Sequence, residues 1–142
     1  MSLHGDYDPE NIFAKIIRGE IPCAKVFEDD HVIAFMDAFP QAPGHTLVVP
    51  KAQARNLLEL SETDAAEAII RAKRIAAAVE TALEPDGIIF TQFSGAPAGQ
   101  TVFHVHFHII PRSEGAAMAG HGQGMADMAD LETMAARIRE AL

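Results

Sequence analysis

The spacing of hydrophobic residues divides the chain into short helices and strands. Apolar residues recur at three-and-four spacing in three segments, which predicts helices over 11–18, 61–83 and 127–142. Runs rich in β-branched and aromatic residues, bounded by turn formers, predict strands over 24–28, 31–36, 45–49, 88–93 and 101–110. We therefore predict an α+β fold: an antiparallel sheet of about five strands with one long helix and a short N-terminal helix.

Capping and turn residues set the expected ends of these elements. Asn11 is expected to cap the first helix and Gly19 to end it, while Ser61 is expected to cap the long helix. The pair at 29–30, Asp-Asp, predicts a hairpin between two strands, and Pro50 is expected to stop the strand that begins at 45.

The segment 101–110 has the most informative pattern. It alternates strictly, so His104, His106 and His108 are expected on one face of a strand. Val105, Phe107 and Ile109 would then face the core. At about 3.3 Å per residue, neighbouring imidazoles would lie about 6.6 Å apart.

Three interpretations fit this row: a solvated strand face, a metal site, or a nucleophilic imidazole flanked by histidines. No Asp, Glu or Cys lies between Gly87 and Arg112, and the sequence 99–101, Gly-Gln-Thr, offers an oxyanion several donors. We therefore favour attack on phosphorus, with the central His106 as nucleophile. His45, which opens a strand after Pro-Gly, is a second candidate for the site.

Composition limits the alternatives. The 142 residues fit a single domain, with a core over about 10–112, a flexible loop over 113–126 and a C-terminal helix over 127–142. The net charge of −9 argues against nucleic acid as a partner, and no apolar run approaches the roughly 20 residues of a membrane span. With no signal-peptide pattern and a single cysteine, Cys23, the expected location is cytoplasmic.

The histidine row also resembles the histidine triad (HIT) family. The sequence 104–110, His-Val-His-Phe-His-Ile-Ile, has the family's alternation of histidine and apolar residues. Further similar segments follow the family's order: 11–22, 27–30, 35–37, 41–51 and 99–102. The resemblance covers about residues 10–112 and is strongest to the Hint-like branch of nucleotide hydrolases and nucleotidyl transferases. It implies a HIT-like fold and a homodimer formed through the strand 88–93 and the long helix.

The resemblance also implies an activity and a set of roles. The substrate would be a purine nucleoside phosphoramidate or related nucleotide, cleaved at its α-phosphorus through a nucleotidyl-histidine intermediate on His106. The backbone carbonyl near His104 would accept the other ring proton of His106, and His104 would donate a proton to the leaving group or join a relay. His108 and His45 would hold phosphate oxygens. The implied substrate contacts are Asp37 for the ribose; Ser94, Gly99, Gln100 and Thr101 around the phosphate; and Ile12, Phe13, Ile16, Phe35 and Ala38 for the base.

The sequence departs from the family at the first helix, where a metal site is common. Many bacterial relatives carry a Cys-x-x-Cys pair for zinc at the first helix, but here those positions are Asn11 and Ala14. We predict no metal and no cofactor. Two other functions stay open: hydrolysis of dinucleoside polyphosphates, and nucleotide-dependent regulation in which turnover is incidental.

Overall fold

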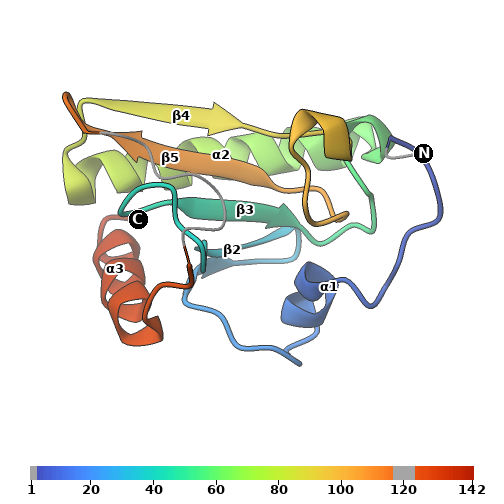
Figure 1. Cartoon of the computed structure of the whole chain (residues 1–142), viewed down its shortest axis with the longest axis horizontal. Helices are drawn as coiled ribbons and strands as arrows, with labels where there is room; N and C mark the ends of the chain where they lie inside the picture. Colours follow the sequence, from blue (N-terminus) through green and yellow to red (C-terminus); the bar gives the residue numbers. More distant parts are fainter. Residues whose placement is uncertain (1–2, 117–123) are drawn as a thin grey trace.

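The computed structural model describes residues 3–116 and 124–142 and contains a five-stranded antiparallel sheet (Figure 1). The strands lie in the order β1-β2-β3-β5-β4, which confirms the predicted sheet. Their bounds are β1 Lys25–Glu28, β2 Val32–Met36, β3 Thr46–Pro50, β4 Gly87–Thr91 and β5 Phe107–Arg112.

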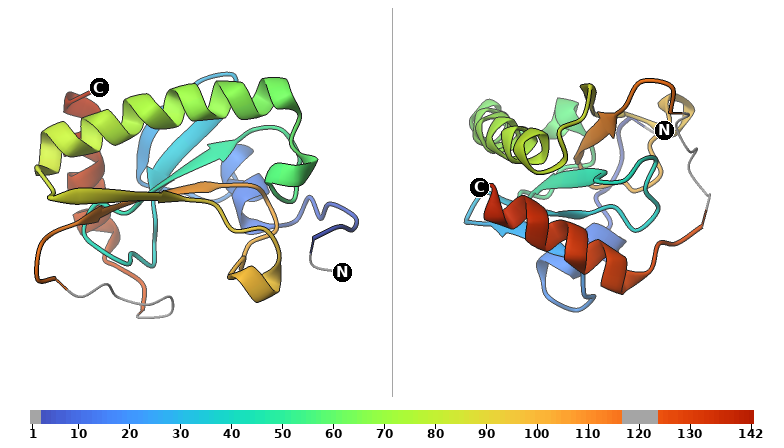
Figure 2. Two further views of the ribbon diagram at one scale, coloured as in Figure 1. Left: turned by 90° about the horizontal axis from the view of Figure 1, so that it is seen from above. Right: turned by 90° about the vertical axis from the view of Figure 1, so that its left-hand side faces the viewer.

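Helices cover both faces of the sheet. The long helix α2 lies along one face and the short helix α1 on the opposite face (Figure 2). The bounds are α1 Ile12–Ile17, α2 Glu62–Leu83 and α3 Met128–Glu140, with short 3-10 turns η1 Leu57–Glu59 and η2 Ala96–Ala98. Within the described part of the chain, no helix is both long and apolar enough to cross a membrane.

The alternation of β2 shows how the two faces are filled. Val32, Ala34 and Met36 belong to the larger core, which α2 and α3 also line. Ile33 and Phe35 belong to a smaller apolar cluster beneath α1. Every residue of β2 is therefore buried, because this strand is covered on both sides.

The predicted helix caps are confirmed. The side chain of Asn11 accepts a hydrogen bond from the backbone N–H of Ala14, and that of Ser61 accepts one from Asp64. Asp127 caps α3 in the same way, so this helix begins where the sequence predicts.

The predicted strand 101–110 is wrong in its first half, since β5 begins only at Phe107. Before Phe107 the chain forms hydrogen bonds with the end of β3 and the segment that follows it, not with a neighbouring strand. The backbone N–H of Val105 donates to the carbonyl of Ala54 at 2.8 Å, outside any strand ladder. The core prediction nevertheless holds, because Val105 and Phe107 are buried in the larger cluster.

Other differences concern exposed residues and ends. Ile12 and Ile69, which belong to the apolar spacing that predicts the helices over 11–18 and 61–83, are 47% and 48% exposed. The strand predicted over 88–93 is β4, Gly87–Thr91, at the sheet edge, and Pro50 is part of β3 rather than its stop. The predicted loop 113–126 lies partly outside the described residues, so its flexibility stays a prediction.

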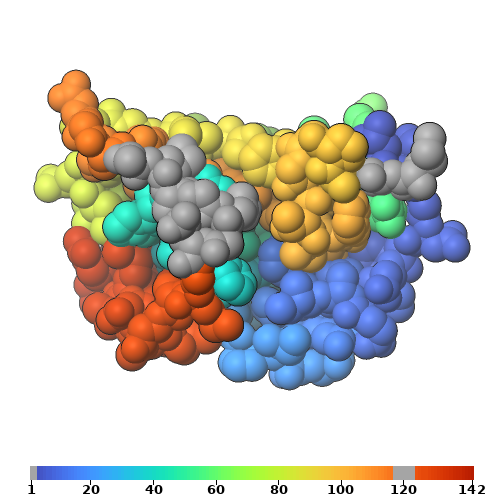
Figure 3. Space-filling view, viewed as in Figure 1, coloured from blue at the N-terminus to red at the C-terminus, as the bar shows by residue number. Residues whose placement is uncertain are grey.

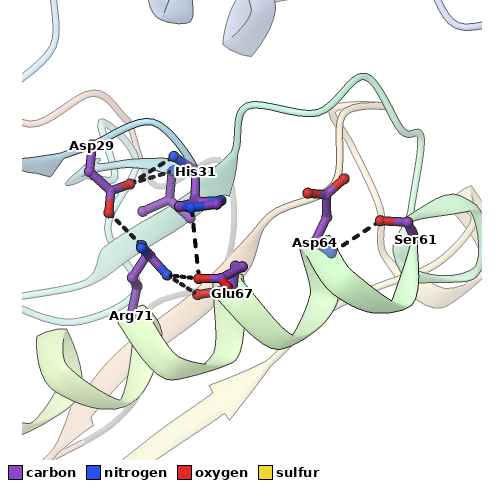
Figure 4. A network of polar contacts seen from close by, with 7 residues as sticks. Asp29, His31, Ser61, Asp64, Glu67 and Arg71 are labelled. Atoms are coloured by element: carbon purple, nitrogen blue, oxygen red, sulfur yellow. Dashed lines mark hydrogen bonds and ion pairs between the residues drawn. The ribbon is translucent and has the colours of Figure 1, made fainter.

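A charged network joins α2 to the β1–β2 turn (Figure 4). The Arg71 guanidinium bonds both Asp29 Oδ2 and Glu67 Oε2 at 2.5 Å. Asp29 Oδ1 also accepts the backbone N–H groups of His31 and Val32. Burial alone would raise the pKa of Asp29, but these hydrogen bonds outweigh it and lower the pKa from 3.8 to about 2.

We expect Asp29→Asn to lower the free energy of unfolding by about 1 kcal/mol at pH 7, a value discounted because water and salt screen this partly exposed pair. The folded-state pKa lies below the unfolded one, so the contribution is complete above about pH 5 and is lost as the pH falls through 2. Urea denaturation at pH 7 and pH 3 should show the difference from wild type shrink by about half at pH 3. The exposed Glu80→Gln serves as control, and an Asp29→Asn difference that does not change with pH would contradict the assignment.

Candidate active site

His106 stands just before β5 on the α1 side of the sheet, and one of its ring nitrogens is fixed. Its Nδ1 lies 2.6 Å from the backbone oxygen of His104. A carbonyl can only accept, so Nδ1 carries the hydrogen and Nε2 carries the lone pair. The edge of the Phe13 ring packs against the imidazole with centroids 4.8 Å apart, which further limits its rotation. The ring is therefore held in the tautomer that an Nε2 nucleophile requires.

A second imidazole pair lies beside it. The backbone N–H of Gln41 donates to His45 Nδ1 at 3.0 Å, so in the neutral ring the hydrogen of His45 is on Nε2. His45 Nε2 lies 2.9 Å from His108 Nδ1, which must then accept, and the hydrogen of His108 is on Nε2. The rings of His106 and His108 have centroids 5.0 Å apart. The structure thus sets His106, with its lone pair on Nε2, beside His108, with its hydrogen on Nε2.

Asp37 joins this pair from the end of β2. Its backbone N–H donates to the His45 carbonyl at 2.9 Å, and its Oδ2 lies 3.4 Å from His45 Nε2. Its Oδ1 accepts the backbone N–H of Phe39 at 2.8 Å. The carboxylate is therefore oriented toward the histidine cluster.

The same three side chains could also hold a metal ion. Among the described residues, Asp37, His45 and His108 each offer a ligand atom, and these atoms lie within 4.8 Å of one another. A metal bound through His45 Nε2 or His108 Nδ1 would displace the hydrogen bond between the two imidazoles. The absence of a metal stays a prediction.

His104 does not share the face of the other two histidines. Its ring is fully buried; Nε2 donates to the Pro50 carbonyl at 2.7 Å and Nδ1 lies 2.5 Å from the Tyr7 hydroxyl. Burial lowers the pKa of His104 despite the bond to Pro50, which keeps the ring neutral. Both nitrogens are thus occupied away from His106, which argues against the predicted role of His104 as proton donor. Its backbone carbonyl, in contrast, lies where the sequence predicts.

Gln100 is also placed differently from the prediction. Its side-chain oxygen accepts the backbone N–H of Gly95 at 2.8 Å. Its amide nitrogen donates to the carbonyls of Arg55 and Val102 at 2.6 and 3.0 Å. A buried amide needs such partners, so this side chain holds the η2 loop together rather than reaching a phosphate.

The remaining predicted phosphate contacts surround this loop. Gly99 and Thr101 are exposed, and the hydroxyl of Ser94 donates to the Gln92 side chain at 3.0 Å. The ring of Phe93 lies 5.2 Å from that of His108, a contact that sequence reasoning missed. Sequence reasoning also missed the backbone N–H of Gln41, although its segment, 41–45, already matched the family pattern.

The predicted base pocket is only partly open. Phe13, Ile16 and Phe35 are buried in the smaller apolar cluster, whereas Ile12 is exposed and Ala38 is half-buried. The gold loop with η2 and the blue chain around α1 border this region on the face seen in Figure 3. A ligand at the cluster would therefore meet an apolar wall on one side and the η2 loop on the other.

The protein thus has an α+β fold whose antiparallel sheet holds three histidines close together. His106 is fixed in one tautomer, and the hydrogen-bonded pair His45 and His108 lies beside it. The family model of the HIT domain matches residues 18–115, so the chain belongs to the HIT family.

Known proteins agree with this assignment. The chain is 46% identical over 101 residues to "Protein hit" of Bacillus subtilis, covering 71% of this chain and 70% of that protein. It is 42% identical over 101 residues to "Adenosine 5'-monophosphoramidase hnt1" of Schizosaccharomyces pombe, covering 71% and 73%. A solved "Hit-like protein involved in cell-cycle regulation" from Bartonella henselae matches with a TM-score of 0.93 at 50% identity, covering 97% and 100%.

Proposed function

We propose that this protein is an enzyme that hydrolyses purine nucleoside phosphoramidates or related nucleotides at the α-phosphorus. The observation that carries the proposal is the 2.6 Å hydrogen bond from His106 Nδ1 to the His104 carbonyl. It places the lone pair on Nε2, and a neutral imidazole is a competent nucleophile near pH 7. The relative from Schizosaccharomyces pombe, named a monophosphoramidase, supports the substrate class.

The reaction proceeds in two displacements. His106 Nε2 forms a bond to the α-phosphorus while the bond from phosphorus to the leaving amine breaks, and the amine takes a proton from solvent. Water then attacks the nucleotidyl-histidine, the N–P bond breaks, and a nucleoside monophosphate is released with return of a proton to solvent. The His104 carbonyl stabilises the ring proton of the positively charged intermediate.

His45 and His108 act on the phosphoryl group rather than on the leaving group. The hydrogen-bond chain from Gln41 through His45 leaves the hydrogen of His108 on Nε2, as a donor for a phosphoryl oxygen. Such a fixed donor stabilises charge that develops on oxygen in the transition state. Asp37 would hold the ribose hydroxyls, and Ile12 with Ala38 would meet the base.

The direct test is turnover of adenosine 5′-phosphoramidate by metal-free protein, with intact-mass detection of a nucleotidyl adduct after a mildly alkaline quench. We expect AMP release and an adduct of one nucleotidyl group. Turnover of diadenosine polyphosphates alone would change the substrate class. Tight nucleotide binding without turnover of either would favour the regulatory alternative.

We also propose that the protein is a homodimer formed through β4 and α2. β4 is an edge strand, and Ile89 and Phe90 on it are 36% and 41% exposed, while Ile69 is exposed on α2. Unpaired strand edges with apolar residues favour association with a second copy.

Ile89→Lys should convert a dimer of twice the 15.3 kDa chain mass to a monomer, because a charge would be buried in the contact. Light scattering after size exclusion measures the mass. Met128→Lys, at an exposed methionine on α3, is the matched control and should leave the dimer intact. A wild-type protein that is monomeric at 100 μM would overturn this assignment.

A further inference from the structure

Tyr7 makes a contact with His104 that the site described above does not use. Its hydroxyl lies 2.5 Å from His104 Nδ1, and the two rings meet edge to face with centroids 5.6 Å apart. Because His104 Nε2 must donate to the Pro50 carbonyl, Nδ1 of the neutral ring is the acceptor and the phenol is the donor. Burial raises the pKa of the Tyr7 phenol, so the donor hydrogen stays on oxygen at neutral pH.

The backbone around His104 has few other restraints. Residues 101–106 lie outside the sheet, and β3 pairs with β5 only from Phe107 onward. The carbonyl that orients His106 therefore depends on local contacts. These are the Val105 bond to Ala54, the two bonds of the His104 ring, the Gln100 bond to the Val102 carbonyl, and the Arg55 guanidinium over the Phe103 ring. Loss of either ring bond would free a buried imidazole to rotate and the adjacent carbonyl to shift.

The segment that carries Tyr7 is itself docked on the body of the protein. The Leu3 carbonyl accepts the side-chain N–H of Asn56 at 2.7 Å, and the Asp6 carbonyl accepts a guanidinium N–H of Arg55 at 3.2 Å. These bonds hold Tyr7 over His104 from outside the catalytic cluster. The contact joins residues 97 positions apart in the chain.

We propose that Tyr7 is a positioning residue for catalysis: its hydroxyl locks the His104 ring, and through the His104 carbonyl it holds His106 in its nucleophilic tautomer. The kinetic part of this inference rests on the proposed hydrolase function. The structural part is that Tyr7 fixes the tautomers of His104 and His106, and it does not rest on the hydrolase function.

The kinetic test compares Tyr7→Phe with wild type on adenosine 5′-phosphoramidate. We expect kcat to fall about tenfold with KM within about twofold, because the substrate contacts stay and only the nucleophile is less well held. His4→Ala is the matched control: it removes another contact of the same segment, His4 to Glu59 at 3.6 Å, and should keep the wild-type kcat. A Tyr7→Phe variant with the wild-type kcat would overturn the kinetic part.

A conservative replacement adds a rescue experiment. Tyr7 is the only tyrosine of the chain, so biosynthetic incorporation of 3-fluorotyrosine changes this position alone. The fluorinated phenol keeps the donor, and this protein should turn over within about twofold of wild type. A loss as large as that of Tyr7→Phe would show that keeping the hydroxyl does not keep the rate, and would overturn the proposal.

The tautomers can be read without any turnover. Long-range ¹H–¹⁵N NMR of ¹⁵N-histidine protein should show the wild-type His104 hydrogen on Nε2 and the His106 hydrogen on Nδ1. In Tyr7→Phe both sets of signals should broaden or shift as the rings exchange. Wild-type His104 protonated on Nδ1 would overturn the proposal even if the variant fails to fold. Correct tautomers without turnover of any nucleotide would instead refute the proposed function alone.

Discussion

His106→Asn should abolish hydrolysis of adenosine 5′-phosphoramidate, with a fall in kcat on the order of 10⁴-fold or more. The asparagine amide nitrogen has no lone pair available for attack, and its oxygen is a far weaker nucleophile than imidazole. Nucleotide affinity should stay within a few-fold of wild type, because the groups assigned to the phosphate and ribose, His108 and Asp37, are unchanged. Single-turnover kinetics and equilibrium binding of AMP measure the two quantities separately.

The matched control for this variant is His31→Asn. His31 is exposed at the β1–β2 turn and contacts Glu67 at 3.8 Å, far along the chain from the cluster. It should keep the wild-type rate and adduct. A His106→Asn variant that keeps more than about a tenth of the rate would assign the nucleophile to another group. If His106→Asn kept this activity and still formed a nucleotidyl adduct, the nucleophile would be a second histidine.

The sequence predicted the parts of the site that depend on near neighbours. His106 and the His104 carbonyl are two residues apart, and the hydrogen bond between them, which the family resemblance implies, is present. The caps at Asn11 and Ser61 are equally local. Such features depend on a few residues and their preferred backbone angles, so a single sequence contains them.

The predictions that were wrong concern structure that depends on residues far away in the sequence. Strict alternation over 101–110 shows only that the chain is extended there. A strand also needs a neighbour with unpaired N–H and C=O groups, and before Phe107 the chain bonds Ala54 and Pro50 instead. The contact between Tyr7 and His104 was unpredictable for the same reason.

Gln100 shows a different limit. An amide beside a glycine-rich loop has the chemistry to bind phosphate, and it has the same chemistry to tie the loop to its surroundings. Burial decides between the two, because a buried amide must find fixed partners within the protein. Here those partners are Gly95, Arg55 and Val102. The sequence gives the donor and acceptor groups but not which of them the fold encloses.

Gly44→Ala should be the most destabilising small substitution near the site, with a loss of about 2–4 kcal/mol in the free energy of unfolding. Gly44 has φ +91°, a region that L side chains rarely adopt. An added Cβ would also overlap Leu83 Cδ1 and lie 3.1 Å from Pro111 Cγ. Because His45 follows directly, the shift should also disturb its bond to His108 and lower kcat. Urea denaturation and steady-state kinetics measure the two effects.

Gly19→Ala separates the two causes of that loss. Gly19 has φ +80°, but a Cβ there would meet nothing within 4 Å. Backbone strain alone should therefore lower the free energy of unfolding of Gly19→Ala, by about 1 kcal/mol. The double variant Gly44→Ala with Leu83→Ala should recover part of the loss relative to the sum of the single variants, because the overlapping atom is gone. Equal losses for Gly19→Ala and Gly44→Ala would show that packing against Leu83 and Pro111 does not hold this turn, and that backbone strain alone keeps glycine before His45.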